Sequence, residues 1–529
     1  MTNTTADFLL FSDNIFTGLT DELIKGYVAI GGNQILKVST NNDYQTLVGE
    51  KTKLLDLKEQ LVAPGFIDVH TFFTGYAIFH IGMDMTDAET TEECMKRLKI
   101  YAGQKGVKDT LFGHGWKPEG FPAEEVERHL NEAYPDRSVI IFAADRSTCL
   151  MNEHARNTYG FTPEKCYPEA YHKIMREYLN DRDFIHREFS DYMKLMNSRG
   201  VTTVKEMGFD DYYGFDHFLK EEEENKELTM RIFFMSQPVG EQINIEHGIR
   251  MREKFTGDFV RFSGYNRMTD GTVASHKGDL LEPYEGQDYC CGIDIDYELI
   301  EKEVHLADEH GFRYSLHAQG DGAVHKVMEI FGKCKKENGK LVNRHAVTDL
   351  EFSNPADLEE MGNIGVTGEI YFQIMSLDPG EAVKESIGKT IGMKRGKYYW
   401  NRRKMLDSGA VLSGATDLPL MITNIPEAIY HGCGGYFPEG GEPFNKQNAI
   451  TVSEMLKAWT YGGAVNLSME EKLGTLEEGK LADITVLERN VFEVPMEEMR
   501  DVKVSLTMVN GEVVYENNGG TEHERKKEI

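Results

Sequence analysis

Residues 62–70, VAPGFIDVH, form a short apolar run that ends in a histidine. The run has the length and composition of a β-strand, and it places His70 at the carboxyl end of that strand. Further strand-like segments follow, each near a helix-like stretch: SVIIFAA (138–144), GVTTVKEMG (200–208), MRIFFMS (230–236), VRFSGYN (260–266), RYSLHAQG (313–320) and GAVLSGATD (409–417). In DYELIEKEVHLADEHG (296–311) and NPADLEEMGNIG (354–365), apolar residues recur at steps of three and four, as in amphipathic helices. This alternation predicts parallel βα units and an α/β fold, most economically a distorted TIM (β/α)8 barrel.

Both ends of the chain differ from this middle. They contain short apolar runs broken by Gly and Asn, among them FLLFSDNIF (8–16), YVAIGGNQILKVS (27–39), KLADITVLERN (480–490) and VKVSLTMVNGEVVYENN (502–518). Such runs are typical of strands, and the pair Asn510-Gly511 is a strong signal for a hairpin. We therefore predict one composite β-sandwich domain from residues 1–62 and 426–529, with a helical segment in the second part. The barrel domain is then 63–425, with a partly helical insertion at about 93–173.

The composition limits the classes of partner. The chain has 529 residues, with 58 Lys and Arg against 88 Asp and Glu, for a formal net charge of −30. Binding to nucleic-acid phosphates or to anionic lipid needs clustered positive charge, so both are disfavoured. No stretch approaches the roughly 20 apolar residues of a membrane span, and the first residues lack the pattern of a signal peptide. The 7 cysteines show no C-x-x-C spacing, which suits a reducing cytoplasm.

Several motifs resemble the amidohydrolase superfamily. VAPGFIDVH resembles the end of its first barrel strand, and GTLEEGKLADITVLE (474–488) with TMVNGEVVY (507–515) resembles its closing β-sandwich strands. Similar motifs follow in the same order through the middle, among them GHGW (113–116), HAQGDGAV (317–324), RHAVTD (344–349) and GATDLPL (414–420). Together they resemble the long-chain branch that includes N-substituted formamide deformylases. The resemblance implies hydrolysis of C–N or related bonds by metal-activated water.

The resemblance also implies a set of metal ligands, and this sequence keeps three of the six positions. His70 stands at the first histidine of the first strand, and His317 matches the histidine of the fifth strand. Asp417 matches the aspartate after the eighth strand, which takes the proton of the attacking water. These three residues are therefore the catalytic candidates.

The other three positions have changed. Phe72 replaces the second histidine, and Asn266 replaces the lysine that becomes carboxylated. Asp349 stands where the histidine of the sixth strand is expected. A phenyl ring cannot bind a metal and an amide cannot form a carbamate bridge, so a binuclear centre is not expected.

Two alternatives remain open for the chemistry. Two nitrogens and two carboxylates are enough for one divalent ion, Zn, Mn or Fe, held by His70, His317, Asp349 and Asp417. In the other alternative no metal is bound. Asp417 is then a general base, and His70 or His317 protonates or polarises the substrate.

Seven residues are candidates for binding substrate: Arg146, His276, Lys277, His114, Trp116, Phe72 and Glu206. A lost metal leaves a gap in the stabilisation of negative charge, and a cation such as Arg146 would fill it. His276 and Lys277 follow TDGTVAS, in a loop that the resemblance places near the substrate. Packing explains His114 and Trp116 equally well. Glu206 ends another predicted strand, as a second carboxylate for proton transfer or as an ion-pair partner.

The first functional hypothesis is an enzyme that hydrolyses a C–N or C–O bond of a small amide, lactam or lactone. The second is an isomerase, hydratase or lyase that uses the same pocket without net hydrolysis, for which the loss of a water-activating metal is easier to understand. The third is a non-catalytic binder of small molecules. Relatives with this architecture are often dimers, so the resemblance also suggests a homodimer.

Overall fold

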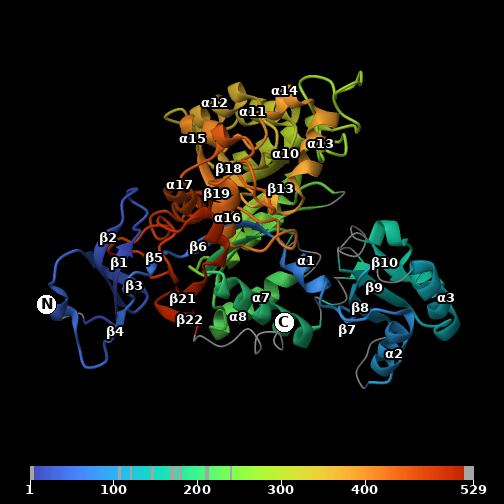
Figure 1. Cartoon of the computed structure of the whole chain (residues 1–529), viewed down its shortest axis with the longest axis horizontal. Coiled ribbons are helices and arrows are strands. Elements are labelled where there is room, and N and C mark those ends of the chain that lie inside the picture. The colour runs from blue at the N-terminus through green and yellow to red at the C-terminus, as the bar shows by residue number, and fades with distance from the viewer. Residues whose placement is uncertain are drawn as a thin grey trace. The chain divides into compact units, whose positions relative to one another are not determined.

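The computed structural model describes residues 5–104, 109–118, 122–144, 148–166, 173–174, 178, 181–208, 214–238 and 241–517 (Figure 1). The chain divides into two compact units. The first comprises residues 1–71, 193–210 and 216–529, and the second comprises 72–192 and 211–215. The second unit is therefore an excursion of the chain that leaves after the first barrel strand.

The first unit contains a barrel of eight strands. Its members, in sheet order, are β19 (Val411–Gly414), β18 (Thr367–Ile370), β17 (Ala346–Asp349), β14 (Tyr314–Ala318), β13 (Val260–Met268), β12 (Arg231–Ser236), β11 (Val201–Glu206) and β6 (Phe66–Thr71). All neighbours pair in parallel, and a parallel bridge between Thr71 and Leu418 brings the two edges together. The α/β fold with a distorted TIM barrel is confirmed.

Helices follow most of these strands, as βα units require. Those along the barrel are α8 (Phe215–Asn225), α9 (Ile245–Lys254), α10 (Tyr297–Glu309), α11 (Asp321–Phe331), α12 (Pro355–Ile364), α13 (Gly380–Thr390), α14 (Met393–Gly396), α15 (Arg402–Asp407) and α16 (Ile425–Gly432). The chain continues through α17 (Val452–Lys457), a π-helical turn η7 (Ala458–Gly462) and α18 (Gly463–Asn466). Short 3-10 turns are η1 (Tyr44–Leu47), η5 (Ile374–Ser376), η6 (Lys446–Asn448) and η8 (Met496–Asp501), and β15 (Lys336–Glu337) forms a hairpin with β16 (Lys340–Leu341).

Local sequence explains where α12 begins and ends. The Asn354 side chain accepts a hydrogen bond from the Ala356 backbone N–H, and Pro355 occupies the first turn, where its missing N–H is harmless. At the other end Gly365 adopts φ 79°, a left-handed conformation that glycine reaches without a steric penalty. The helix predicted from NPADLEEMGNIG is therefore present.

Both ends of the chain build one sheet, which confirms the separate domain predicted from the termini. Its strands, in order, are β22 (Glu512–Glu516), β21 (Val504–Val509), β20 (Ile484–Leu487), β5 (Leu61–Pro64), β1 (Phe8–Ile15), β2 (Ile24–Gly31) and β3 (Gln34–Ser39), with β4 (Lys53–Asp56) paired to β1. Asn510 and Gly511 have φ 55° and 81° and form the predicted tight turn between β21 and β22. The predicted limits of the domains stay a prediction.

A buried arginine joins the barrel to this terminal sheet. Arg231 of β12 donates to both carboxylate oxygens of Asp483 at 2.7 and 2.8 Å, and to Asn510 Oδ1 at 3.1 Å. Its remaining donors reach the Asp258 carbonyl at 2.9 Å, while the guanidinium lies over the Phe259 ring. The charge is fully paired although the side chain is buried.

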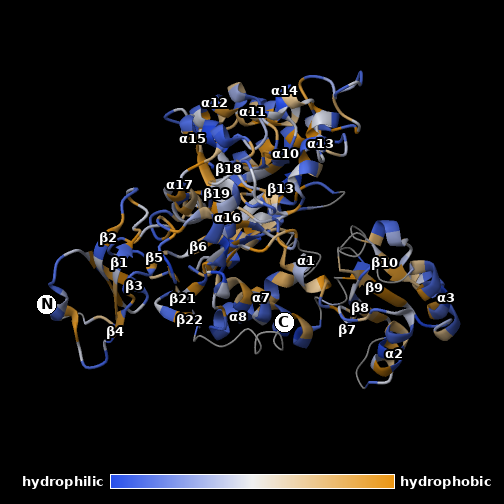
Figure 2. Ribbon diagram, viewed as in Figure 1, coloured by the Kyte–Doolittle hydropathy of each residue, from blue (hydrophilic) through white to orange (hydrophobic). Residues whose placement is uncertain are grey.

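The second unit has a sheet of its own, in the order β10 (Cys149–Met151), β9 (Val139–Ala143), β8 (Leu111–Trp116) and β7 (Met83–Asp84). Its helices are α1 (Phe73–Ile78), α2 (Thr91–Ala102), α3 (Ala123–Ala133) and α4 (Glu153–Tyr159), with the 3-10 turn η2 (Pro163–Lys165); α7 (Arg182–Ser198) leads back to the barrel. The segment SVIIFAA is thus a strand, but it belongs to this sheet and not to the barrel. Figure 2 shows β9 in the colour of hydrophobic residues, in keeping with its complete burial.

No helix in the described part of the chain is both long enough and apolar enough to span a bilayer.

Candidate active site

The carboxyl ends of the barrel strands bring His70 and Asp417 together. His70 ends β6, and its Nε2 lies 3.6 Å from Asp417 Oδ1. The Asp417 backbone N–H donates to the His70 carbonyl at 2.9 Å, which fixes the loop after β19 against β6. Asp68 reinforces this loop, because its carboxylate accepts the Thr416 hydroxyl at 2.7 Å. The two catalytic candidates therefore share one mouth, as the resemblance implies.

A second histidine–carboxylate pair lies on β14 and β17. His317 Nε2 is 3.4 Å from Asp349 Oδ2, and His317 Nδ1 is 3.7 Å from Asp270 Oδ1. Gln319 Nε2 also donates to Asp349 Oδ2 at 2.6 Å. Asp270 is anchored in turn by the backbone N–H groups of Gln319, Gly320 and Asp279 at 2.9–3.0 Å.

Both mouth aspartates adopt left-handed backbone conformations. Asp349 has φ 80° and Asp417 has φ 53°. A residue other than glycine rarely adopts such angles, and strained backbone of this kind gathers at functional sites. The conformation lets each strand end turn its carboxylate toward a histidine.

His317 and Asp417 at the mouth both have raised pKa values, for different reasons. Burial alone would lower the pKa of His317, but Asp349, Asp270 and Asp417 outweigh it and raise the pKa to about 9. Burial raises the pKa of Asp417 to about 6, and Asp349 adds to the rise while His70 and His317 oppose it. The Asp417 side chain still exposes 32% of its surface, so a substrate can reach it. At neutral pH the site holds a protonated imidazole beside a carboxylate that can accept a proton.

Below the mouth, Glu369 of β18 occupies the inside of the barrel and is completely buried. Five side chains surround its carboxylate: His70 Nδ1 at 3.4 Å, Ser315 Oγ at 3.0 Å, Thr348 Oγ1 at 2.7 Å, Asn466 Nδ2 at 3.1 Å, and Lys205 Nζ in an ion pair. The carboxylate therefore orients His70 from behind, so that His70 Nε2 faces Asp417.

Lys205 of β11 supplies the charge that balances Glu369. Its ammonium also donates to Asn466 Oδ1 at 2.9 Å, and Arg313 Nη1 donates to the same oxygen at 2.8 Å. Burial lowers the pKa of Lys205 to about 8, against the opposing effect of Glu369. Burial alone would raise the pKa of Glu369, but Lys205 and His70 hold it well below its usual range. A closed network of charges thus forms the floor of the site.

Two tyrosines and a further carboxyl complete the mouth. The Tyr371 ring meets the His70 ring edge-on, with centroids 6.0 Å apart. Burial, reinforced by Asp349, raises the pKa of Glu351 to about 8, and a hydrogen bond with Tyr399 opposes the rise. An aromatic wall beside ionisable groups suits a small, partly apolar ligand.

The residues at the mouth keep only part of the metal-ligand set that the resemblance implies. Asn266 Nδ2 donates to Gln237 Oε1 at 2.7 Å, so the position of the carboxylated lysine is occupied by a hydrogen-bonded amide. Among the residues that the structure describes, three ligand atoms lie within 4.8 Å of one another in two groups, neither of them at the mouth: Asp308 with Cys334 and His345, and His186 with Glu222 and Glu227. His70 pairs with Asp417 at 3.6 Å and His317 pairs with Asp349 at 3.4 Å, and Asp417 also interacts electrostatically with His317.

The group around His345 has a structural explanation. The Tyr314 backbone N–H donates to His345 Nδ1 at 3.0 Å, so the ring proton lies on Nε2, 3.0 Å from Asp308 Oδ1. Asn343 Nδ2 donates to the same carboxylate oxygen at 2.7 Å. These bonds use the atoms that a metal would need.

Three candidates for substrate binding lie in the first unit. His276 stacks on Tyr284 with centroids 4.3 Å apart, and its Nδ1 lies 3.0 Å from the Tyr289 hydroxyl. Lys277, the next residue, is exposed. Glu206 is buried at the end of β11 and accepts a hydrogen bond from the Thr71 hydroxyl at 2.9 Å. Their contact with substrate stays a prediction.

The remaining candidates lie elsewhere. Within the second unit, His114 Nδ1 is 3.2 Å from the Ile81 carbonyl, and Trp116 packs in the core of that unit. Phe72 precedes helix α1 and is partly buried. Arg146 lies outside the described residues.

The inference from sequence missed the floor of the site. Lys205 and Glu369 are charged residues inside the buried strand runs VTTVKE and TGEI, the first of which also contains Glu206. A charge at such a position must be paired if the strand is buried on both faces, and this was the available signal. Asp270, two residues after the end of β13, was a second signal of this kind.

Comparison with known proteins agrees with this architecture. YtcJ of Bacillus subtilis (strain 168) is 21% identical over 496 residues, covering 88% of this chain and 91% of YtcJ. N-substituted formamide deformylase of Arthrobacter pascens is 21% identical over 575 residues, covering 97% of this chain and 99% of the relative. An uncharacterized metal-dependent hydrolase from Pyrococcus horikoshii OT3 has the same fold, with a TM-score of 0.73, 19% identity, and coverage of 93% of this chain and 99% of that chain.

The sequence also matches the amidohydrolase family over residues 53–515, most of the chain. The chain therefore belongs to the amidohydrolase family and is an amidohydrolase-like hydrolase.

Proposed function

We propose that this protein hydrolyses a small amide, lactam or lactone by acid–base chemistry, without a catalytic metal. The observation that carries the proposal is the pairing of His70 with Asp417 and of His317 with Asp349 at one barrel mouth. The pairs differ in proton affinity, with the pKa of Asp417 near 6 and that of His317 near 9. A base and an acid that are both ready near neutral pH are what general acid–base hydrolysis requires.

In the proposed reaction Asp417 accepts a proton from water while the water oxygen bonds to the substrate carbonyl carbon. Protonated His317 donates a hydrogen bond to the carbonyl oxygen and stabilises the negative charge that develops there. The C–N or C–O bond then breaks, and the leaving atom takes the proton held by Asp417. The products are a carboxylic acid and an amine or alcohol, so atoms and protons balance.

His70 has a positioning role in this scheme. Glu369 holds its Nδ1 at 3.4 Å, so that Nε2 faces the Asp417 carboxylate at 3.6 Å. The fixed imidazole ring of His70 keeps Asp417 oriented while Asp417 accepts the proton. The carboxylate–histidine arrangement of other hydrolases orients its groups in the same way. Lys205 keeps Glu369 charged and thereby preserves this orientation.

The first test is the metal content of the untagged protein, together with hydrolysis in the presence of a chelator. The first substrates to test are N-substituted formamides, because a relative is named for their deformylation. Lactams and lactones are tested next. We expect less than about 0.1 equivalent of metal and activity that is unchanged by chelation. Activity that needs about one equivalent of zinc, manganese or iron would contradict metal independence.

Solvent labelled with ¹⁸O separates hydrolysis from isomerisation and elimination. A hydrolase incorporates one solvent oxygen into the acid product. An isomerase gives a product of unchanged mass, and a lyase that eliminates gives fragments without solvent oxygen. Either of these results would overturn the hydrolytic proposal.

A further inference from the structure

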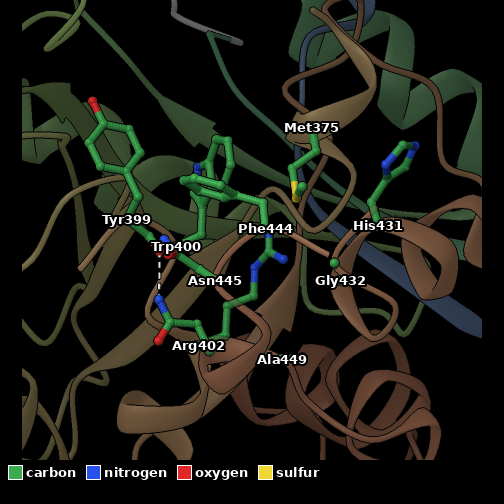
Figure 3. A pocket seen from close by; sticks show the side chains of 11 residues that line it. Met375, Tyr399, Trp400, Arg402, His431, Gly432, Phe444, Asn445 and Ala449 are labelled. Atoms are coloured by element: carbon green, nitrogen blue, oxygen red, sulfur yellow. Dashed lines mark hydrogen bonds between the residues drawn. The ribbon is translucent and has the colours of Figure 1, made fainter. Parts of the chain in front are cut away.

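A small, partly open cavity lies in the first unit, behind the segment that follows β18. Its volume is about 10 Å³, room for one water molecule or one monatomic ion. The cavity is lined by Met375, Tyr399, Trp400, Arg402, His431, Gly432, Gly435, Phe444, Asn445, Asn448 and Ala449. Figure 3 shows the Arg402 guanidinium in the middle of this lining, near Phe444 and Gly432.

Arg402 is buried without a countercharge. Its side chain is 3% exposed, and its Nη2 donates to the carbonyls of Tyr371 and Phe372 at long distances of 3.4 and 3.3 Å. Its Nε has no partner, and no described Asp or Glu side chain forms an ion pair with it. The nearby ionisable group is the thiol of Cys433.

Other buried arginines of this fold are compensated. Arg231 is held by both oxygens of Asp483, and Arg313 lies in the network of Glu369. An uncompensated buried cation is strongly unfavourable, so an anion is expected wherever the protein supplies none. Arg402 is the exception among these three.

The rest of the lining offers hydrogen-bond donors and no carboxylate. The Trp400 side chain is 8% exposed and its Nε1 has no partner. The Asn448 amide is already bound to the carbonyls of Lys397 and Tyr399 at 2.9 and 2.8 Å. His431 Nδ1 is bound to the Tyr436 carbonyl at 2.6 Å. Among the described residues, the lining atoms without a hydrogen-bond partner are Arg402 Nε, Trp400 Nε1 and His431 Nε2, and the last of these lies 3.9 Å from Glu427 Oε1.

We propose that this cavity is a binding site for one halide-sized anion, such as chloride, held by the Arg402 guanidinium. The small volume favours a monatomic anion over phosphate, sulfate or a carboxylate, and the positive charge disfavours a cation. Arg402 also bonds the carbonyls of Tyr371 and Phe372, and the Tyr371 ring meets His70 at the mouth. The bound anion thus stabilises the segment that carries one wall of the active site.

The direct test is a crystal of the full chain soaked in bromide, with anomalous diffraction recorded at the bromine edge. We expect one strong peak in the cavity, within hydrogen-bond distance of an Arg402 nitrogen. A cavity that refines as water, with no anomalous signal in it, overturns the proposal.

Thermal unfolding in solution gives an independent test. Sodium chloride and sodium gluconate are compared at equal ionic strength, because gluconate is too large for the cavity. We expect chloride to raise the unfolding midpoint of the wild type by about 2 °C, as a ligand that binds the folded state does. Equal midpoints in the two salts contradict the proposal.

Matched variants assign the effect to Arg402. Arg402→Met keeps most of the packing volume and should abolish the chloride shift, whereas Arg403→Met removes a charge that is paired to Glu454 and Asp407 and should keep it. If Arg402→Met does not fold, Trp400→Phe serves instead, since it removes one donor and should reduce the shift. A chloride shift that is equal in all variants assigns it to another site and overturns the proposal.

Discussion

The two histidines of the barrel mouth sit in opposite electrostatic settings. His70 faces Glu369, whose charge is balanced by Lys205, whereas His317 faces Asp349 and Asp270. No described Lys or Arg side chain forms an ion pair with either of these two aspartates. The difference is that Lys205 neutralises the carboxylate beside His70, whereas the two carboxylates beside His317 act together to raise the pKa of His317.

The largest effect is expected where both histidines converge, at Asp417. Asp417→Asn removes the proposed base and should lower kcat by about 1,000-fold, equivalent to about 4 kcal/mol. The measurement is kcat on the substrate found by the panel, with the thermal midpoint recorded alongside. Asp288→Asn changes an exposed carboxyl and should leave kcat unchanged. Equal activity of the two variants would remove Asp417 from the mechanism.

The interactions of His70 are tested most directly by removing Lys205, the countercharge of Glu369. Lys205→Met leaves Glu369 buried and unpaired, so the free energy of unfolding should fall by about 3 kcal/mol. Adding Glu369→Gln should recover most of the lost free energy of unfolding, because the unpaired buried charge is then removed. Chemical denaturation measures both, with the exposed Lys389→Met as a control expected to change little. A double variant as unstable as the single one contradicts the pairing.

The role of His317 is tested by removing its positive charge. His317→Gln keeps a donor but not the positive charge, and kcat should fall by about 100-fold, equivalent to about 2.7 kcal/mol. His325→Gln alters a half-exposed histidine that is bound to Asp357 and serves as the matched control. A loss as small as that of the control would show that the charge on His317 does not serve catalysis.

The smallest expected effect concerns the cause of the raised His317 pKa, the difference between the two histidines. Asp349→Asn removes one carboxylate beside His317, so the His317 pKa should fall from about 9 by about one unit, or about 1.4 kcal/mol. Histidine NMR titration measures this shift without a substrate, and an unchanged titration would assign the raised pKa to other groups.

The pH profile follows from the same two groups. Because the folded pKa of His317 lies above the unfolded value of 6.5, its charge stabilises the fold fully below pH 6.5, and this contribution is lost as pH rises toward 9. Activity should fall below about pH 6, where Asp417 is protonated, and above about pH 9, where His317 is neutral. Asp349→Asn should move the basic limb toward lower pH, and the acidic limb by less in the same direction, because Asp349 also raises the pKa of Asp417.

Local signals in the sequence were sufficient to predict individual strands, helices and turns. The apolar run ending at His70, the amphipathic period of Asp296–Gly311 and the pair Asn510-Gly511 each specify their structure within a few residues. The order of the barrel follows because parallel strands need helical crossovers. These are the features that short-range physics determines.

The missed features depend on partners far along the chain. Lys205 and Glu369 meet across the barrel, 164 residues apart, so neither reveals its role alone. The strand Val139–Ala143 has the same composition as a barrel strand, and only its pairing with β8 and β10 assigns it to another sheet. Long-range pairing was the information that the single sequence did not carry.

The sheet built from both termini has a consequence for synthesis. β5 waits for β20, which is translated more than 400 residues later, and Arg231 waits for Asp483, 252 residues further along the chain. Until the ribosome has released that last segment, the edge of β5 is open and a barrel arginine is stranded without its carboxylate. The barrel therefore completes these contacts only after β20 has left the ribosome, and until then the nascent chain exposes an open strand edge of the kind that aggregates.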